Sequence, residues 1–171
     1  MTWFDEAEEI LAKMKKAQAE SAEEWGNFTP RALKALAGAG KEARAMASNA
    51  VGVEHLLIGL LILGDGVAVN VLKSFGITLE SFRASVLKMH GGVFETQSPP
   101  VQISLTPRLK RVLANAKKEA AAMSHGYIGT ETILLSILLE TDGVPYRAFK
   151  QAGIDPMAMR VEILGEIQLR R

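Results

Sequence analysis

The sequence repeats itself at a fixed offset of 77 residues. Residues 28–87 align with residues 105–164 without a gap, and 23 of the 60 aligned pairs are identical. Chance similarity between helical segments would not hold a single register over that length. A duplicated unit of this size usually means two copies that pack in pseudo-symmetry and bury faces that neither copy could bury alone. We therefore expect one domain built from two equivalent halves.

The first two predicted helices of each copy have clear starts. One helix begins after Thr29 and after Thr106, because threonine is a good N-cap and the proline that follows suits the first helical position. The next begins at Val53 and at Thr130. It is apolar on nearly all sides, which predicts a buried central helix.

Two further helices complete each copy. The third follows Asp65 and Asp142, where we expect the aspartate to cap the helix, and the fourth begins at Thr78 and at Asp155. No segment shows sustained alternation of apolar and polar residues, so no half-buried strand is predicted. The expected fold class is all-α, with two four-helix repeats packed as one domain.

An acidic segment precedes the repeats. Residues 1–27 (the N-terminal segment) contain seven acidic residues and three lysines, a net charge of −4, whereas the whole chain has +1 and the remainder therefore +5. Apolar residues at 4-3-4-3 spacing predict one amphipathic helix; they are Trp3, Ala7, Ile10, Met14 and Ala17. We expect this helix to fold back on its own core. The alternative is a docking or homodimerisation helix, whose contact residues would be Trp3, Phe4, Ile10, Leu11 and Met14.

The predicted organisation therefore has four parts: an N-terminal segment (1–27), a first repeat (28–89), a linker (90–104) and a second repeat (105–171). The linker contains two glycines and two prolines, which indicate irregular structure. The longest apolar stretch, residues 56–63, is far shorter than the roughly 20 residues that span a bilayer. With no signal peptide evident, we expect a soluble cytoplasmic protein without a membrane partner.

Few residues suggest chemistry. The chain has no cysteine, which excludes disulfides and thiol catalysis. The sequence around Lys41 fails the phosphate-loop pattern, and the three histidines lack the spacing of metal ligands. We expect no catalytic residue, no metal and no cofactor. One basic cluster is interpreted as a solvated helix face, with a weak nucleic-acid surface as the alternative; it comprises Arg108, Lys110, Arg111, Lys117 and Lys118.

One constellation recurs in both copies. A glycine precedes the buried helix and a glutamate lies in its first turn, at Gly52 and Glu54 and again at Gly129 and Glu131. These residues suit an ordinary helix start, with glycine for the tight entry and glutamate for the helix dipole. A sharper hypothesis adds the Thr-Pro-Arg starts, since a helix N-terminus suits a phosphate and a carboxylate suits a guanidinium. The candidate binding residues are Thr29, Arg31, Gly52, Val53, Glu54, Thr106, Arg108, Gly129, Thr130 and Glu131.

The two copies resemble the double Clp N-terminal repeat of the Hsp100/Clp unfoldases of the ClpC, ClpA and ClpB type. Both copies show the Thr-Pro-Arg start, the Gly-x-Glu turn and the Gly-Val and Gly-Ile boundaries in the same order. The resemblance covers residues 28–164. It implies a non-catalytic domain that receives substrates and adaptor proteins for an AAA+ ATPase ring, which unfolds them and delivers them to a protease or releases them.

The resemblance implies that, as in the ClpC branch of the family, the Gly-x-Glu turns form two pockets for phosphorylated arginine. This chain departs from the usual Gly-Thr-Glu-His turn, with Val53 in the first copy and Thr132 in the second. The first copy also has Ala50 where the second keeps the usual aromatic residue, Tyr127. The pocket of Glu131 is therefore the better candidate.

The AAA+ modules of the family are not part of this sequence. The Met1 start and the additional helix favour a free-standing protein over a piece of a longer unfoldase. Such a protein would be an adaptor or receptor that docks on a Clp ATPase or protease. The remaining alternatives are a nucleic-acid-binding or self-associating helical protein.

Overall fold

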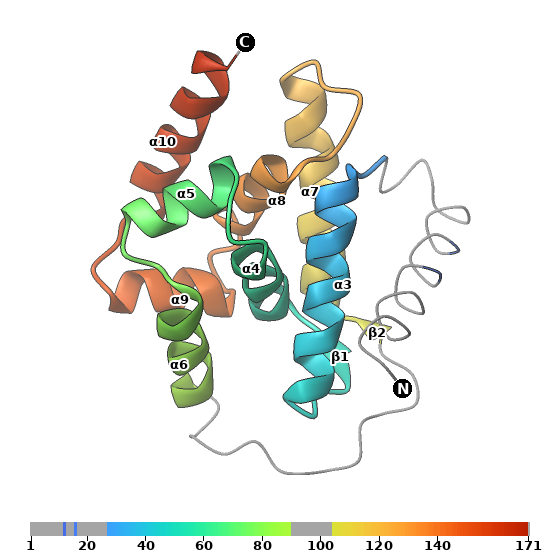
Figure 1. The fold of residues 1–171 in the computed structure, drawn as a ribbon, viewed down its shortest axis with the longest axis vertical. Coiled ribbons are helices and arrows are strands. Elements are labelled where there is room, and N and C mark those ends of the chain that lie inside the picture. The colour runs from blue at the N-terminus through green and yellow to red at the C-terminus, as the bar shows by residue number, and fades with distance from the viewer. Residues whose placement is uncertain (1–11, 13–15, 17–26, 90–103, 171) are drawn as a thin grey trace.

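Each copy of the repeat folds into four helices in the same order (Figure 1). The structure is a computed structural model, and it describes residues 12, 16, 27–89 and 104–170. The first copy contains α3 (Pro30–Ala45), β1 (Ala50–Val51), α4 (Val53–Ile62), α5 (Val67–Ser74) and α6 (Leu79–Met89). The second contains β2 (Ser104–Leu105), α7 (Pro107–Ala122), α8 (Thr130–Ile137), α9 (Val144–Gln151) and α10 (Pro156–Leu169). The all-α fold class is confirmed.

The threonine caps form as predicted. The hydroxyl of Thr29 accepts a hydrogen bond from the Ala32 N–H at 3.1 Å, and that of Thr106 accepts one from Leu109 at the same distance. These bonds satisfy N–H groups that the first turn of a helix leaves without an intrahelical partner. Asp155 caps α10 in the same way. Capping depends on neighbouring residues alone, which is why the sequence predicts it well.

The aspartate caps predicted for the third helices are wrong. Gly66 and Gly143 are the N-cap residues of α5 and α9, and neither helix has a side-chain cap. At Gly66 the backbone φ is +98°, which glycine adopts readily and other residues rarely do. The chain therefore turns one residue beyond Asp65, whose carboxylate pairs with Arg31 instead.

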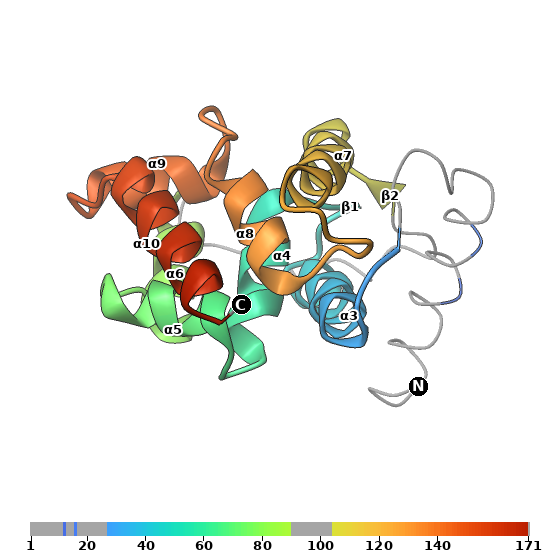
Figure 2. The same cartoon turned by 90° about the horizontal axis from the view of Figure 1, so that it is seen from above.

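The two copies exchange short backbone pairings. β1 pairs in parallel with β2, so that Val51 lies opposite Leu105, and an isolated parallel bridge joins Phe28 to Ile128. These pairings are equivalent under the 77-residue offset. The entry to each first helix is thus held by the turn of the other copy, and α3 and α7 run antiparallel, side by side (Figure 2).

One core serves both copies. Buried residues from all eight helices form a single apolar cluster. α5 packs against α8 and α10, and α9 packs against α4 and α6, so each third helix contacts the other copy. Phe82 of α6 and Phe149 of α9 are fully buried, with ring centroids 6.5 Å apart. The repeats therefore form one domain.

The closest helix approach is between α3 and α4. A Cβ atom at Gly59 would lie 2.1 Å from the carbonyl oxygen of Ala35. Glycine therefore lets the backbones meet at this point. In the second copy Ser136 occupies the equivalent position, and its hydroxyl donates to the carbonyl of Thr132.

Part of the sequence prediction lies outside the described residues. The proposed docking residues Trp3, Phe4, Ile10, Leu11 and Met14 are among these. Of the N-terminal segment before residue 27, only Ala12 and Lys16 are described, and both are helical and exposed. Among the described helices none is by itself long and apolar enough to cross a membrane; α4 and α5 meet that test only as a pair bent by 100°.

Candidate functional site

The Gly-x-Glu turn of the first copy lies at the start of α4. The N–H of Gly52 donates to Nδ1 of His55 at 2.9 Å, which closes the turn from within. Glu54 folds back over the glycine, so that a Cβ atom at Gly52 would lie 2.7 Å from both carboxylate oxygens. The absence of a side chain at Gly52 therefore leaves the space that the Glu54 carboxylate occupies.

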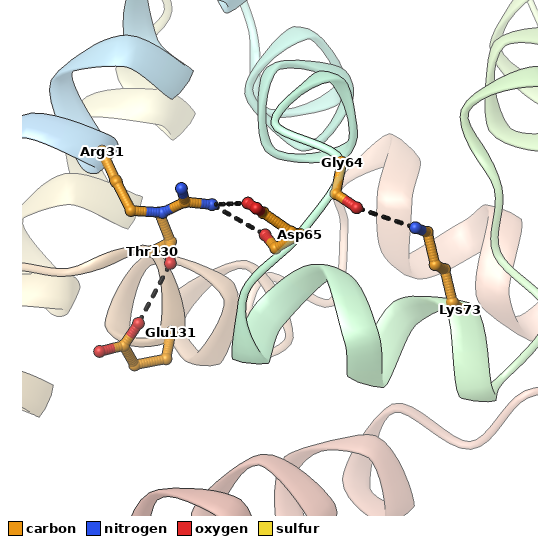
Figure 3. A network of polar contacts seen from close by, with 6 residues as sticks. All are labelled: Arg31, Gly64, Asp65, Lys73, Thr130 and Glu131. Atoms are coloured by element: carbon orange, nitrogen blue, oxygen red, sulfur yellow. Dashed lines mark hydrogen bonds and ion pairs between the residues drawn. The ribbon is translucent and has the colours of Figure 1, made fainter.

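The second copy builds the same turn with a different residue. At the start of α8 the N–H of Gly129 donates to Oγ1 of Thr132 at 3.0 Å, so threonine takes over the role of His55. Glu131 again covers the glycine, with Oε1 2.9 Å from the position a Cβ would take. The hydroxyl of Thr130 donates to Oε2 of Glu131 at 3.1 Å (Figure 3).

Neither glutamate has a cationic partner within the described parts of the chain. The side chain of Glu54 is only 17% exposed, and its nearest basic atom, Nδ1 of His55, lies 4.0 Å away. That nitrogen accepts the Gly52 N–H and so carries no proton. No described lysine or arginine pairs with Glu131 either. Two half-buried carboxylates thus have no cationic partner among the described residues.

Each turn lies beside the first helix of the opposite copy. The carbonyl of Val51, just before Gly52, accepts the N–H of Thr106 at 3.0 Å. The carbonyl of Ile128, just before Gly129, accepts the N–H of Thr29 at 2.9 Å. The sequence did not indicate which helix start accompanies which turn. The structure groups them as two composite sites, one at each end of the antiparallel α3–α7 pair.

The two site arginines have different surroundings. Nη2 of Arg31 donates to the carbonyl of Asp65 at 2.9 Å and to its carboxylate at 2.5 Å (Figure 3). Lys73 holds the same loop through the carbonyl of Gly64 at 2.9 Å. In the other site Arg108 is half-buried, and its Nε is enclosed without a hydrogen-bond partner in the described structure. We define these as site A (Thr29 and Arg31 with Gly129–Glu131) and site B (Thr106 and Arg108 with Gly52–Glu54).

Sequence reasoning missed two contributors. Thr132 appeared only as a departure from the usual turn and His55 only as one of three histidines, yet each accepts the N–H that fixes its glycine. Their position three residues after the N-cap was the available signal. Next to site A, Tyr127 is 48% exposed and stacks on His125, with ring centroids 5.3 Å apart. Among the described residues no three acidic or histidine side chains gather as metal ligands.

Comparisons with known proteins agree with this architecture. The family model of the Clp repeat (R) N-terminal domain matches residues 27–152. A probable ATP-dependent Clp protease ATP-binding subunit of Chlamydia pneumoniae is 40% identical over 145 residues, covering 82% of this chain and 17% of that protein. The chloroplastic chaperone protein ClpC of Pisum sativum is 41% identical over 137 residues, covering 80% and 15%. The chain thus spans less than a fifth of the length of these relatives.

Solved structures share the fold. The N-terminal domain of the caseinolytic protease associated chaperone ClpD from Arabidopsis thaliana superposes with a TM-score of 0.66 at 26% identity, covering 83% of this chain and 95% of that one. The Hsp104 N-terminal domain from Candida albicans gives 0.67 at 23% identity, covering 84% and 91%. In Clp and Hsp100 chaperones this non-catalytic domain is generally involved in substrate or adaptor interaction. The family model covers most of the chain, and the solved structures of the family share its fold. The chain therefore belongs to the Clp N-terminal domain family.

Proposed function

We propose that the chain is a recognition module of the Clp system that binds proteins marked by phosphorylated arginine at sites A and B. Such a mark combines an anionic phosphoryl group with a planar cationic guanidinium-type group. A site for it needs donors for the phosphoryl oxygens and a carboxylate at a fixed distance from them. Both composite sites offer these two elements.

The helix starts supply the anion-binding element. α3 and α7 each have 16 residues, and their first turns carry N–H groups and a partial positive charge. No acidic residue lies in the first turn of either helix, although the Asp65 carboxylate contacts Arg31 at the start of α3. Arg31 and Arg108 add a guanidinium to each start. Arg108 has an enclosed Nε without a partner, and a phosphoryl oxygen would satisfy it.

The glutamates supply the cation-binding element. Glu54 and Glu131 are shielded from solvent, and each is held over a glycine without a basic partner among the described residues. A guanidinium can pair with such a carboxylate through two parallel hydrogen bonds. The observation that carries the proposal is that the turn that holds each glutamate is hydrogen-bonded to the helix start of the opposite copy.

Titration calorimetry with free phosphoarginine tests the proposal on the full chain. Glu131→Gln and Glu54→Gln keep the shape of each side chain and remove its charge. Loss of one charge-assisted pair, about 1.5–3 kcal/mol, predicts a roughly 10- to 150-fold weaker affinity for the altered site. The double variant should lose measurable binding, as should Glu131→Ala at site A.

Glu80→Gln is the matched control. Glu80 is also a first-turn glutamate, but it is exposed on α6 and remote from both sites, so its removal should leave the affinity unchanged. Unphosphorylated arginine and phosphoserine each lack one of the two groups and should bind much more weakly. Absence of heat from phosphoarginine with the unaltered chain would refute the proposal, as would equal affinity for plain arginine.

The wider role follows from the same proposal. A recognition module of this kind works by presenting its ligand to a Clp ATPase or protease, and the relatives matched here are Clp ATPase subunits or Clp chaperones. A pull-down from the native lysate should recover such a partner, and the chain should show no turnover of its own. Recovery of nucleic acid alone would favour a different function.

A further inference from the structure

The net positive charge of the two repeats comes from two helices. α3 and α7 together contain nine basic and two acidic residues, a net charge of +7. The remaining residues of 27–89 and 104–170 contain seven basic and nine acidic residues, a net charge of −2. The +5 excess of the repeats is therefore a property of the α3–α7 pair.

The two acids of this pair do not offset its charge on the outside. Glu42 is buried and pairs with Arg83, and Glu119 pairs with Arg160 at 2.8 Å with 14% of its side chain exposed. Both face the fourth helix of their own copy. Acidic residues of other elements pair with Arg31 and Arg111, which leaves Lys110 and Lys117 of α7 without an acidic partner among the described residues.

One stripe of α7 combines this charge with small residues. Lys110, Ala114, Lys117 and Ala121 follow one another at 4-3-4 spacing, so they lie on one side of the helix. All four are exposed or half-buried, and neither lysine has an acidic partner among the described residues. We call these four residues the α7 stripe. Small residues allow another helix to approach closely, and the lysines favour an acidic one.

The N-terminal segment has the complementary properties. It carries −4, and its apolar residues from Trp3 to Ala17 form a stripe of about 21 Å at 1.5 Å per residue, against about 17 Å for the α7 stripe. Ala12 and Lys16 are helical and exposed. At 100° per residue these two lie on the side opposite the apolar stripe, so their exposure leaves that stripe free to face a partner.

The chain path brings the segment to the correct end of α7. The carbonyl of Asn27 accepts the N–H of Ile128 at 2.6 Å, and Ile128 lies six residues after the end of α7 at Ala122. The segment therefore joins the domain near Ala121, at one end of the α7 stripe. From there it can run back along α7 toward Lys110 without crossing the core.

We propose that the N-terminal segment docks intramolecularly on the α7 stripe, with its apolar face against the alanines and its acidic residues toward Lys110 and Lys117. This places a helix of the same chain along the face whose two ends carry sites A and B. The docking is held by charge as well as by apolar contact, so salt weakens it.

A distance measurement between two spin labels tests this in the full chain. The protein has no cysteine, so Ala12→Cys and Ala122→Cys introduce the only two labelling positions, both exposed and both off the α7 stripe. Docking predicts one narrow distance distribution. Lys110→Glu with Lys117→Glu should broaden it several-fold, and adding Glu6→Lys, a reversal within the stretch that carries the apolar stripe, should narrow it in part.

Lys88→Glu with Lys150→Glu is the matched control, because these exposed lysines lie on α6 and α9 and carry the same charge change. The control should leave the distribution narrow. A broad distribution in the unaltered chain, or a narrow one that ignores the Lys110 and Lys117 changes, would overturn the proposal. Loss of the narrow distance when excess unlabelled chain is added would also overturn it, because a second copy would then be the occupant. Displacement of the segment by short duplex DNA would overturn it too, because the surface would then bind nucleic acid.

Discussion

Replacement of Gly59 by alanine should destabilise the domain although alanine is the better helix former. The added Cβ would lie 2.1 Å from the carbonyl oxygen of Ala35, whereas ordinary contacts begin at 3.4 Å. α3 and α4 would have to separate where their backbones meet. Such overpacking lowers the free energy of unfolding by about 3 kcal/mol, at the upper end of the usual range. The helix propensity of alanine returns about 1 kcal/mol. The net loss is about 2 kcal/mol, or about 4–8 °C in Tm for a chain of this size.

Urea and thermal unfolding followed by far-UV circular dichroism measure this loss. Gly165→Ala is the matched control, because Gly165 lies within α10, is exposed and has nothing within 4 Å of the added Cβ. There the same substitution should stabilise the domain by about 0.4–1 kcal/mol. The reasoning predicts opposite signs at the two positions. If Gly59→Ala stabilised the domain as Gly165→Ala does, the close backbone approach of α3 and α4 would be refuted.

Four further substitutions at three positions separate buried from exposed interactions, each measured by urea unfolding. Glu119→Ala should cost about 2 kcal/mol, because it leaves the 19%-exposed side chain of Arg160 without its ion-pair partner. Asp65→Ala should cost less than about 1 kcal/mol, since that carboxylate is 76% exposed; an equal loss for both would contradict the burial argument. His55→Ala should cost about 2 kcal/mol by leaving a buried N–H without an acceptor. His55→Thr should cost clearly less, because the second copy closes the same turn through Thr132.

The sequence predicts those parts of the fold that depend on neighbouring residues. The Thr29 and Thr106 caps form as expected because the threonine hydroxyl reaches only to the next turn. The 77-residue offset also predicts equivalent contacts in both copies. The aspartate cap of the first copy fails for a local reason of another kind, since the positive φ of Gly66 moves the helix start beyond Asp65.

The arrangement of the sites could not be predicted in the same way. Strands of two residues, such as β1, are too short to show alternation, so the pairing between copies has no periodic signal. That pairing places the turn of Glu131 beside the start of α3 and not beside the start of α7. The glycine and glutamate of each turn were identified from the repeat. Their partners come from contacts between residues 99 positions apart (Thr29 and Ile128) and 55 positions apart (Val51 and Thr106) in the sequence.

An NMR titration of the full chain with phosphoarginine tests most directly whether each site is shared between the copies. Backbone amide signals of residues 31–33 and 129–131 should shift together for site A, and those of 108–110 and 52–54 together for site B. Glu131→Gln should then abolish the shifts at residues 31–33, in the other copy, while those at 108–110 remain. Loss of the shifts at 108–110 instead, or no shifts in either helix start with the unaltered chain, would contradict the account.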